Sequence, residues 1–318
     1  MTKMSMTKCL SIWQSIKLES SQSAFKRFDA VHPLDFYLGL DSEDRSLLLF
    51  VTVEEPPNQL DMRAVSLKKI PRDDGRWSLL LILEDARLTE LFALLCEDLI
   101  EHSRFIGKYS PLDFVLRRLN SWRHFFERAE STLLTLNEIR GLCGELACLE
   151  LLIDKLGPIE AVAAWVGPVG ANQDFQFGSS AWEVKTVRPG AETVVIASER
   201  QLDGLDRTIE LYVVELSDAG PNSVGGFNLN SKVLKIRNTL ESDYIALSDF
   251  DNKLVVAGYI WHQKYEDLVF QLRGFTRYSV LDGFPLLRKA ELPFGILNVN
   301  YELELSACIN FIAEQVSF

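Results

Sequence analysis

Short apolar runs separated by turn-forming residues predict a small antiparallel sheet in the first third of the chain. Turns rich in Asp, Pro and Gly separate these runs, which cover 36–40, 47–53, 63–68 and 77–83. Two helices are expected next, over 88–106 and 111–129. Ser110 is a suitable N-cap for the second helix, and Pro111 fits its first turn.

From about residue 131 the pattern changes to alternating helix and strand. Thr135 and Glu138 form a capping-box pattern, which predicts a helix that continues to about Leu156. A second such pattern, at Ser198 and Gln201, predicts another helix start. Strands are expected over 160–165, 174–177, 181–187 and 209–216. The element order αβββαβ indicates the α/β class.

The last hundred residues are expected to mix helices and strands. The patterns predict a helix over 231–240, strands near 268–272 and 277–281, and a final helix over 306–316. We therefore expect three regions, whose bounds are 1–130, 131–218 and 219–318. The first is a β-rich accessory region with a small sheet and two helices, the second is the α/β core, and the third is an α+β accessory region.

Composition describes a globular chain. It has 318 residues, of which 47% are hydrophobic. The longest apolar runs fall far short of the roughly 20 residues that a membrane-spanning helix needs. Five scattered cysteines favour a reducing compartment. We expect a cytoplasmic protein without a membrane span.

The net charge of −12 bears on nucleic-acid binding. Phosphate binding depends on Lys and Arg, so this charge argues against strong non-specific binding of DNA by the chain alone. It leaves open a local basic groove, or a partner that supplies affinity for DNA.

One predicted hairpin gathers charges on one face. If Ser179 and Ser180 form the turn, alone or with Gly178 and Ala181, Asp174 faces Lys185 and Gln176 faces Glu183. One face is then apolar, with Phe175, Phe177, Trp182 and Val184. The other face is polar, with Asp174, Gln176, Glu183 and Lys185.

Two carboxylates at cross-strand distance repel each other unless one is protonated or a cation lies between them. Asp174 and Glu183 are therefore candidate ligands of Mg²⁺, with Mn²⁺ as a substitute, because Mg²⁺ prefers hard oxygen ligands. Lys185 would orient or help to deprotonate a water molecule, or balance phosphate charge. The alternative interpretation is an ordinary solvated hairpin.

The acidic residue followed by Glu-x-Lys on the next strand, in this element order, resembles the PD-(D/E)XK nuclease superfamily. Further segments resemble a bacterial family known as PD-(D/E)XK motif proteins. These segments are 141–146, 164–168, 174–175, 182–186, 198–203, 284–287, 292–296 and 299–301. The resemblance covers most of the chain, and one departure is that Gln173 stands where the motif has proline.

The resemblance implies a restriction-endonuclease-like core and a metal-dependent DNA endonuclease. It implies that Glu145 is a third metal ligand and that Gln201 is the polar residue of the second core helix. Gene neighbourhoods of that family imply a role in restriction or anti-phage defence, with other proteins of a defence operon as partners and possible homo-oligomers. The alternatives are a catalytically inactive nuclease-fold scaffold or DNA-binding subunit of a defence complex, and an RNA nuclease that uses the same carboxylates.

Overall fold

The computed structural model describes residues 7–19, 25–59, 62–106, 110–127, 133–204, 207–296 and 299–318. The chain divides into two compact units, an N-terminal unit Met1–Leu133 and a C-terminal unit Leu134–Phe318. The last two residues of the helix expected over 111–129 lie outside the described residues. None of the helices in these ranges combines the length and apolar character that crossing a bilayer requires.

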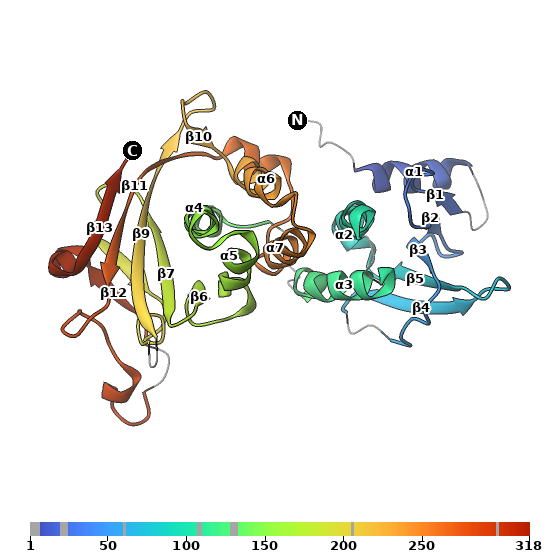
Figure 1. The fold of residues 1–318 in the computed structure, drawn as a ribbon. Helices are drawn as coiled ribbons and strands as arrows, with labels where there is room; N and C mark the ends of the chain where they lie inside the picture. The colour runs from blue at the N-terminus through green and yellow to red at the C-terminus, as the bar shows by residue number, and fades with distance from the viewer. Residues whose placement is uncertain are drawn as a thin grey trace. The chain divides into compact units, whose positions relative to one another are not determined.

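The N-terminal unit contains the predicted antiparallel sheet, in the strand order β1-β2-β3-β5-β4 (Figure 1). Its strands are β1 (Phe25–Arg27), β2 (Phe36–Leu40), β3 (Ser46–Thr52), β4 (Val65–Pro71) and β5 (Trp77–Leu83). Its helices are α1 (Lys8–Glu19), α2 (Thr89–His102) and α3 (Pro111–Glu127), with 3-10 turns η1 (Ala86–Leu88) and η2 (Ser103–Phe105). Asp98 of α2 accepts hydrogen bonds from Arg118 Nε at 2.6 Å and from Trp122 Nε1 at 2.7 Å, and these bonds join α3 to α2.

A mixed sheet forms the centre of the C-terminal unit. Its order is β10-β11-β9-β7-β6, and β13 also pairs with β11. Its strands are β6 (Phe175–Phe177), β7 (Ser180–Val187), β9 (Thr208–Ala219), β10 (Gly226–Phe227), β11 (Val269–Ser279) and β13 (Ile312–Ser317). Strands β7 and β9 are parallel and the other pairs are antiparallel. The α/β class predicted from the sequence is confirmed.

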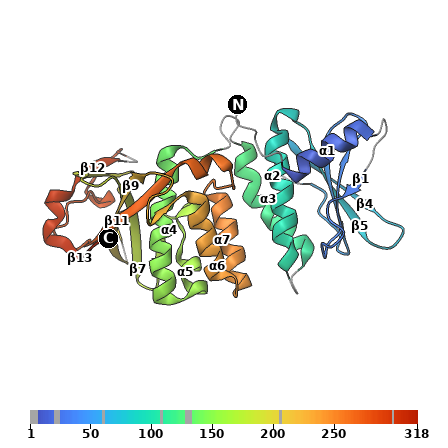
Figure 2. The same cartoon turned by 90° about the horizontal axis from the view of Figure 1, so that it is seen from above.

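Helices cover one face of this sheet, as both views show (Figures 1 and 2). They are α4 (Leu136–Leu156), α5 (Pro158–Ala164), α6 (Leu229–Leu240) and α7 (Tyr244–Val256). The predicted capping box opens α4, since Thr135 accepts from the backbone N–H of Glu138 and the Glu138 side chain accepts from that of Thr135. Helix α4 lies so close to β7 that a Cβ atom on Gly144 would overlap Thr186 Oγ1.

A smaller layer covers the opposite face of the sheet. The pair β8 (Thr193–Ile196) and β12 (Tyr301–Glu304) forms a separate two-stranded sheet. Its apolar side chains share a core with one face of β7 and β9, through Ala181, Val194, Ile196, Ile209, Leu211 and Leu303. The remaining short elements are the 3-10 helices η3 (Gly167–Val169), η4 (Gln263–Asp267), η5 (Lys289–Glu291) and η6 (Leu305–Phe311).

Several elements differ from those predicted, and the two strands expected near 268–272 and 277–281 are one strand, β11. The strand expected over 160–165 is helix α5, which has Pro158 in its first turn and several alanines. The helix expected from Ser198 is a set of turns. The final helix expected over 306–316 is η6 followed by β13, because β-branched residues there pair with β11.

The boundary expected at residue 218 falls inside one compact unit. Strand β11 returns antiparallel to β9, and its pairing extends to Ala219. The turn-forming residues after Asp218 therefore end a strand rather than a domain. Residues 219–318 extend the core sheet and supply α6 and α7.

Candidate metal and catalytic site

The hairpin that carries the predicted charges has a different register from the one expected. Phe175 pairs with Trp182 and Phe177 with Ser180, so Gly178 and Ser179 form the turn. Gly178 has a φ of 53°, which favours glycine at the first position of a two-residue hairpin turn. The pairing is shifted by two residues, so Asp174 comes opposite Glu183 instead of Lys185, while the predicted faces are kept.

Backbone contacts hold Asp174 from two sides. Its Oδ2 accepts a hydrogen bond from the backbone N–H of Val184 at 2.8 Å. Its own carbonyl accepts from the N–H groups of Val166 and Gly167, both at 2.9 Å. A Cβ atom on Gly167 would lie 2.9 Å from Asp174 Oδ1, so glycine leaves room for this carboxylate. The Asp174 side chain is thus fixed at the edge of the sheet.

Glu183 and Lys185 form an ion pair on the face of β7 that also carries Ala181. Glu183 is 1% exposed, and its Oε1 lies 2.8 Å from Lys185 Nζ. Its Oε2 is buried without a hydrogen-bond partner among the described residues. Lys185 Nζ also donates to Gln201 Oε1 at 3.0 Å. The structure therefore brings Glu183, Lys185 and Gln201 together as one connected group.

Glu145 reaches this region from α4, on the helix side of the sheet. Its Oε2 accepts a hydrogen bond from Trp165 Nε1 at 2.8 Å. Trp165 in turn forms a β-bridge with Phe175, at the start of β6. The sequence did not reveal this role for the indole, because the partner lies 20 residues away.

The three carboxyl groups hold their protons more tightly than usual. Burial raises the pKa of Glu145 to about 8, and the nearby Asp174 charge adds to this effect. Burial also raises the pKa of Asp174 to about 6 and moves the pKa of Glu183 well above its ordinary value. Lys185 opposes all three shifts. Such a cluster favours either protons or a cation.

Two of these carboxyl groups fit the requirements of a divalent cation. No group of three Asp, Glu, His or Cys side chains within the described ranges converges as a ready-made metal site. Mg²⁺, however, is commonly held by one or two carboxylates, with water and substrate oxygens completing its shell. The unpartnered Oε2 of Glu183 and the adjacent Asp174 carboxylate match such a set. The Oε2 atom of Glu145, the third expected ligand, already accepts a hydrogen bond from Trp165 Nε1.

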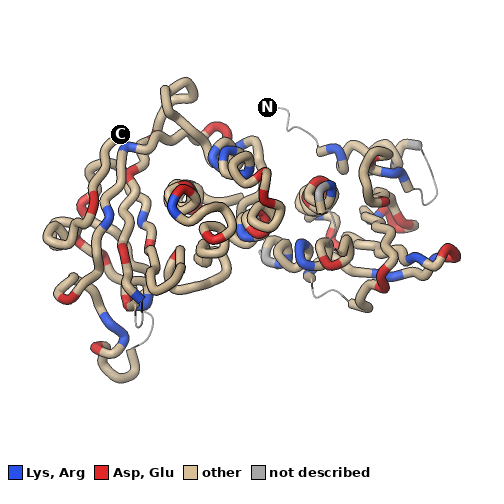
Figure 3. Tube along the Cα trace, viewed as in Figure 1, with Lys and Arg blue, Asp and Glu red and all other residues tan. Residues whose placement is uncertain are grey.

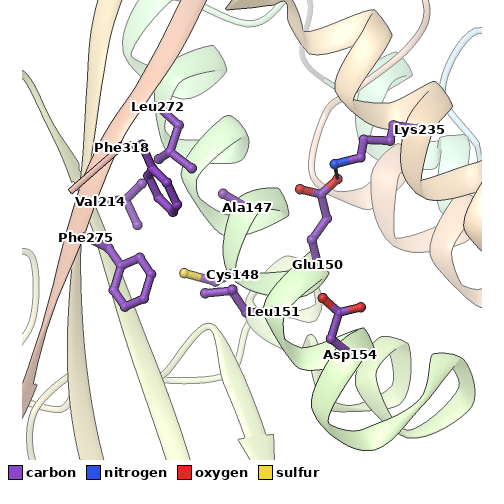
Figure 4. Close-up of a pocket in the computed structure, with 10 residues that line it drawn as sticks. All are labelled: Ala147, Cys148, Glu150, Leu151, Asp154, Val214, Lys235, Leu272, Phe275 and Phe318. Carbon is purple, nitrogen blue, oxygen red and sulfur yellow. Dashed lines mark ion pairs between the residues drawn. The ribbon is translucent and has the colours of Figure 1, made fainter. Parts of the chain in front are cut away.

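A separate pocket lies between α4 and strands β9 and β11. Its volume is about 220 Å³, and Ala147, Cys148 and Phe275 line its apolar wall (Figure 4). Burial raises the pKa of the Cys148 thiol, which makes it a poor nucleophile. Lys235 and Glu150 form an ion pair at its margin, at 2.9 Å. None of the carboxylates of the candidate site lines this pocket.

The comparison with protein families agrees with this geometry. A family model described as "Putative PD-(D/E)XK family member (DUF4420)" matches residues 9–306. The chain belongs to this family. The DUF4420 match includes all the candidate residues and most of both compact units, and it confirms the superfamily predicted from the motif. No curated protein and no solved structure matches the DUF4420 chain.

Proposed function

We propose that this DUF4420 protein is a metal-dependent endonuclease that hydrolyses phosphodiester bonds in DNA and acts in bacterial restriction or anti-phage defence. The main support is the buried Glu183 carboxylate, whose Oε1 pairs with Lys185 while Oε2 has no hydrogen-bond partner. Burying a carboxylate is costly unless each oxygen is satisfied. A cation bound by Oε2 and by Asp174 would satisfy this group.

Asp174 and Glu183 would hold Mg²⁺, or Mn²⁺ in its place. When bound, such a cation supplies Lewis-acid stabilisation of the charge that develops on a phosphodiester. The Val184 N–H keeps the Asp174 carboxylate oriented, and the charge of Lys185 favours the ionised form of Glu183. We propose that Glu145, held in place by the Trp165 indole, supplies a third carboxyl group, which would ionise when a cation binds nearby.

Lys185 would act directly on the reactants. Its Nζ has three donor positions, and Glu183 Oε1 and Gln201 Oε1 are two of its acceptors. The remaining donor can orient an attacking water molecule or bind a phosphate oxygen. Gln201 would therefore determine where this donor points.

The family description supports the substrate part of this proposal, whereas the net charge points to a need for a partner. PD-(D/E)XK membership supports phosphodiester hydrolysis and DNA as the substrate. Lys and Arg are interspersed with Asp and Glu along the chain, whose net charge is −12 (Figure 3). Affinity for DNA would then need a partner, such as another protein of a defence operon or a second copy of the chain. The five free cysteines support a cytoplasmic location.

A plasmid-nicking assay tests the proposed activity. Wild-type protein is incubated with supercoiled DNA and Mg²⁺ or Mn²⁺, alone and with its gene neighbours' products. We expect Glu183→Gln and Lys185→Met to slow nicking by roughly 100-fold or more, the scale seen when a group that stabilises transition-state charge is removed. Glu160→Gln, at an exposed carboxylate of α5, is the matched control and should nick like wild type. Equal nicking by wild type and Lys185→Met would exclude the proposed role of Lys185.

The acidic charge also favours a second candidate, a catalytically inactive scaffold or DNA-binding subunit of a defence complex. Calorimetry separates the two functions. The nuclease should bind Mg²⁺ or Mn²⁺ and lose this binding in Asp174→Asn, whereas the scaffold should bind neither cation there. Nicking of matched DNA and RNA substrates then decides between a DNA nuclease and an RNA nuclease.

A further inference from the structure

Gln173 occupies the position at which the motif of the superfamily has proline. It is 5% exposed and directly precedes Asp174. We propose that Gln173 is a positioning residue, which fixes the turn that contains Gln201 and thereby orients Lys185. This inference rests on the proposed nuclease function for its catalytic meaning, but the contact that it describes can be tested without activity.

Both ends of the Gln173 amide are used. Its Nε2 donates to the carbonyl of Arg200 at 2.8 Å and lies 3.4 Å from the carbonyl of Gln201. Its Oε1 accepts from Gln176 Nε2 at 3.0 Å. Through these bonds the buried Gln173 joins the start of β6 to the turn that contains Arg200 and Gln201, about 25 residues later in the chain. A proline at 173 could make none of these side-chain bonds.

The turn that Gln173 holds has little regular structure of its own. Residues 197–204 contain a turn and a bend over 199–202 and are otherwise irregular, without the ladder of bonds that a helix or strand would supply. Gln201 N donates to the carbonyl of Ser198 at 3.0 Å, and the backbone N–H of Val299 donates to Glu199 Oε2 at 3.1 Å. Besides Leu202, which is buried in the core beside β8 and β12, the position of this segment depends on a few polar contacts, and Gln173 supplies those on the side of β6.

The turn that contains Gln201 also holds Lys185. Gln201 Oε1 accepts from Lys185 Nζ at 3.0 Å and from the backbone N–H of Ala197 at 2.8 Å. The second bond prevents the Gln201 amide from rotating away from the lysine. If the Arg200 and Gln201 carbonyls lost their donor, the segment would move and the acceptor of Lys185 would move with it. Gln173 thus acts on the chemistry through Gln201.

The first test needs neither metal nor substrate. Gln173→Met keeps the side-chain length and removes its hydrogen bonds, and Gln263→Met at an exposed glutamine is the matched control. Two rates are measured by mass spectrometry in the full chain, trypsin cleavage after Arg200 and acetylation of Lys185 relative to the exposed Lys264. Loss of one or two hydrogen bonds should raise both rates by about 5- to 10-fold in Gln173→Met. Unchanged rates, or equal rises in the control, would overturn the proposal.

The second test follows catalysis. Gln173→Met should lower kcat by about 5-fold, as expected for a bond worth roughly 1 kcal/mol. The KM for DNA and the calorimetric affinity for Mg²⁺ should stay within about two-fold of wild type, because neither carboxylate is changed. In a Gln201→Met background, Gln173→Met should cause no further loss, since the two residues act in series. Additive losses would show that Gln173 does not act through Gln201.

The two tests separate this inference from the proposed function. A wild-type protein that neither nicks nucleic acid nor binds a divalent cation would refute the nuclease function. The positioning of Lys185 by Gln173 would still be decided by the trypsin and acetylation rates.

Discussion

Buried carboxyl groups at the candidate site make folding depend on pH. A carboxyl group with a raised pKa binds protons more tightly in the folded chain than in the unfolded chain. Its contribution to stability is greatest below the unfolded pKa and is lost as pH rises through the folded pKa. For Glu145 the contribution is therefore lost over the pH range from its ordinary pKa of 4.5 to its raised pKa of about 8.

We predict that Glu145→Gln reduces this pH dependence in protein kept free of metal by EDTA. The glutamine cannot ionise and still accepts a hydrogen bond from the Trp165 indole. Relative to wild type, the variant should gain about 1 kcal/mol or more in free energy of unfolding between about pH 5 and pH 8. Urea denaturation at several pH values measures this difference. Glu160→Gln should keep the wild-type slope, and an unchanged slope in Glu145→Gln would contradict the prediction.

At the scale of residues, the sequence identified the groups with local spacing. Glu183 and Lys185 are two residues apart on one strand, so the two-residue period of a strand was enough to place them on the same face. Gln173 and Trp165 were not recognised, because their partners at 200–201 and 145 are reached only through the fold. Likewise, the sequence could not predict that Glu183 Oε2 is buried without a hydrogen-bond partner among the described residues, because this depends on how the folded chain packs around it.

Close contact between α4 and β7 gives a prediction at the scale of elements. Gly144→Ala would place a methyl group against Thr186 Oγ1, so helix and strand must separate. We expect a loss of about 1–3 kcal/mol in stability, the usual cost of overpacking. Gly141→Ala, on the same helix with no atom within 4 Å of the added Cβ, should instead stabilise the protein by about 0.5–1 kcal/mol. Thermal and urea unfolding of the pair measure the contrast, and similar effects in both variants would exclude it.

The hairpin turn gives a second prediction at this scale. Gly178 has positive φ, so Gly178→Ala should cost about 1–2 kcal/mol in free energy of unfolding. Gly178→Asn should cost less, because Asn tolerates this conformation better. Gly220→Ala is the control, since Gly220 is outside the left-handed region. Urea unfolding ranks the variants, and equal stability of Gly178→Ala and wild type would show that the turn does not need glycine.

Elements with strong local signals were predicted well. Helix α4 has a capping box at its start, a long apolar stripe and Gly157 at its end, and each signal is local. The helix α5 was mistaken for a strand because seven residues are too few to show a helical period. β13 was mistaken for a helix because its pairing with β11 is a long-range contact, absent from its own sequence.

At the scale of the whole molecule, the compact unit Leu134–Phe318 should fold by itself. It contains the mixed sheet, the helices that cover it and every candidate residue. The fragment 134–318 should unfold cooperatively and keep the accelerated trypsin cleavage of Gln173→Met. The fragment 134–218 should not fold, because β9 would lose β11 and α4 would lose α6. Circular dichroism during denaturation compares them, and cooperative unfolding of 134–218 would restore the boundary first expected at 218.

The register of the hairpin has a consequence for how this site tolerates change. Its strands are displaced by two residues from the alternative pairing, yet Asp174, Glu183 and Lys185 remain on their predicted face. An even displacement preserves the parity of every position, whereas an odd one would invert a strand relative to its neighbour. Turn lengths that differ by two residues are thus compatible with the same constellation. Two residues inserted between 177 and 180 should therefore leave these three side chains on one face, whereas a change of the strand pairing by one residue should move Asp174 to the face opposite Glu183.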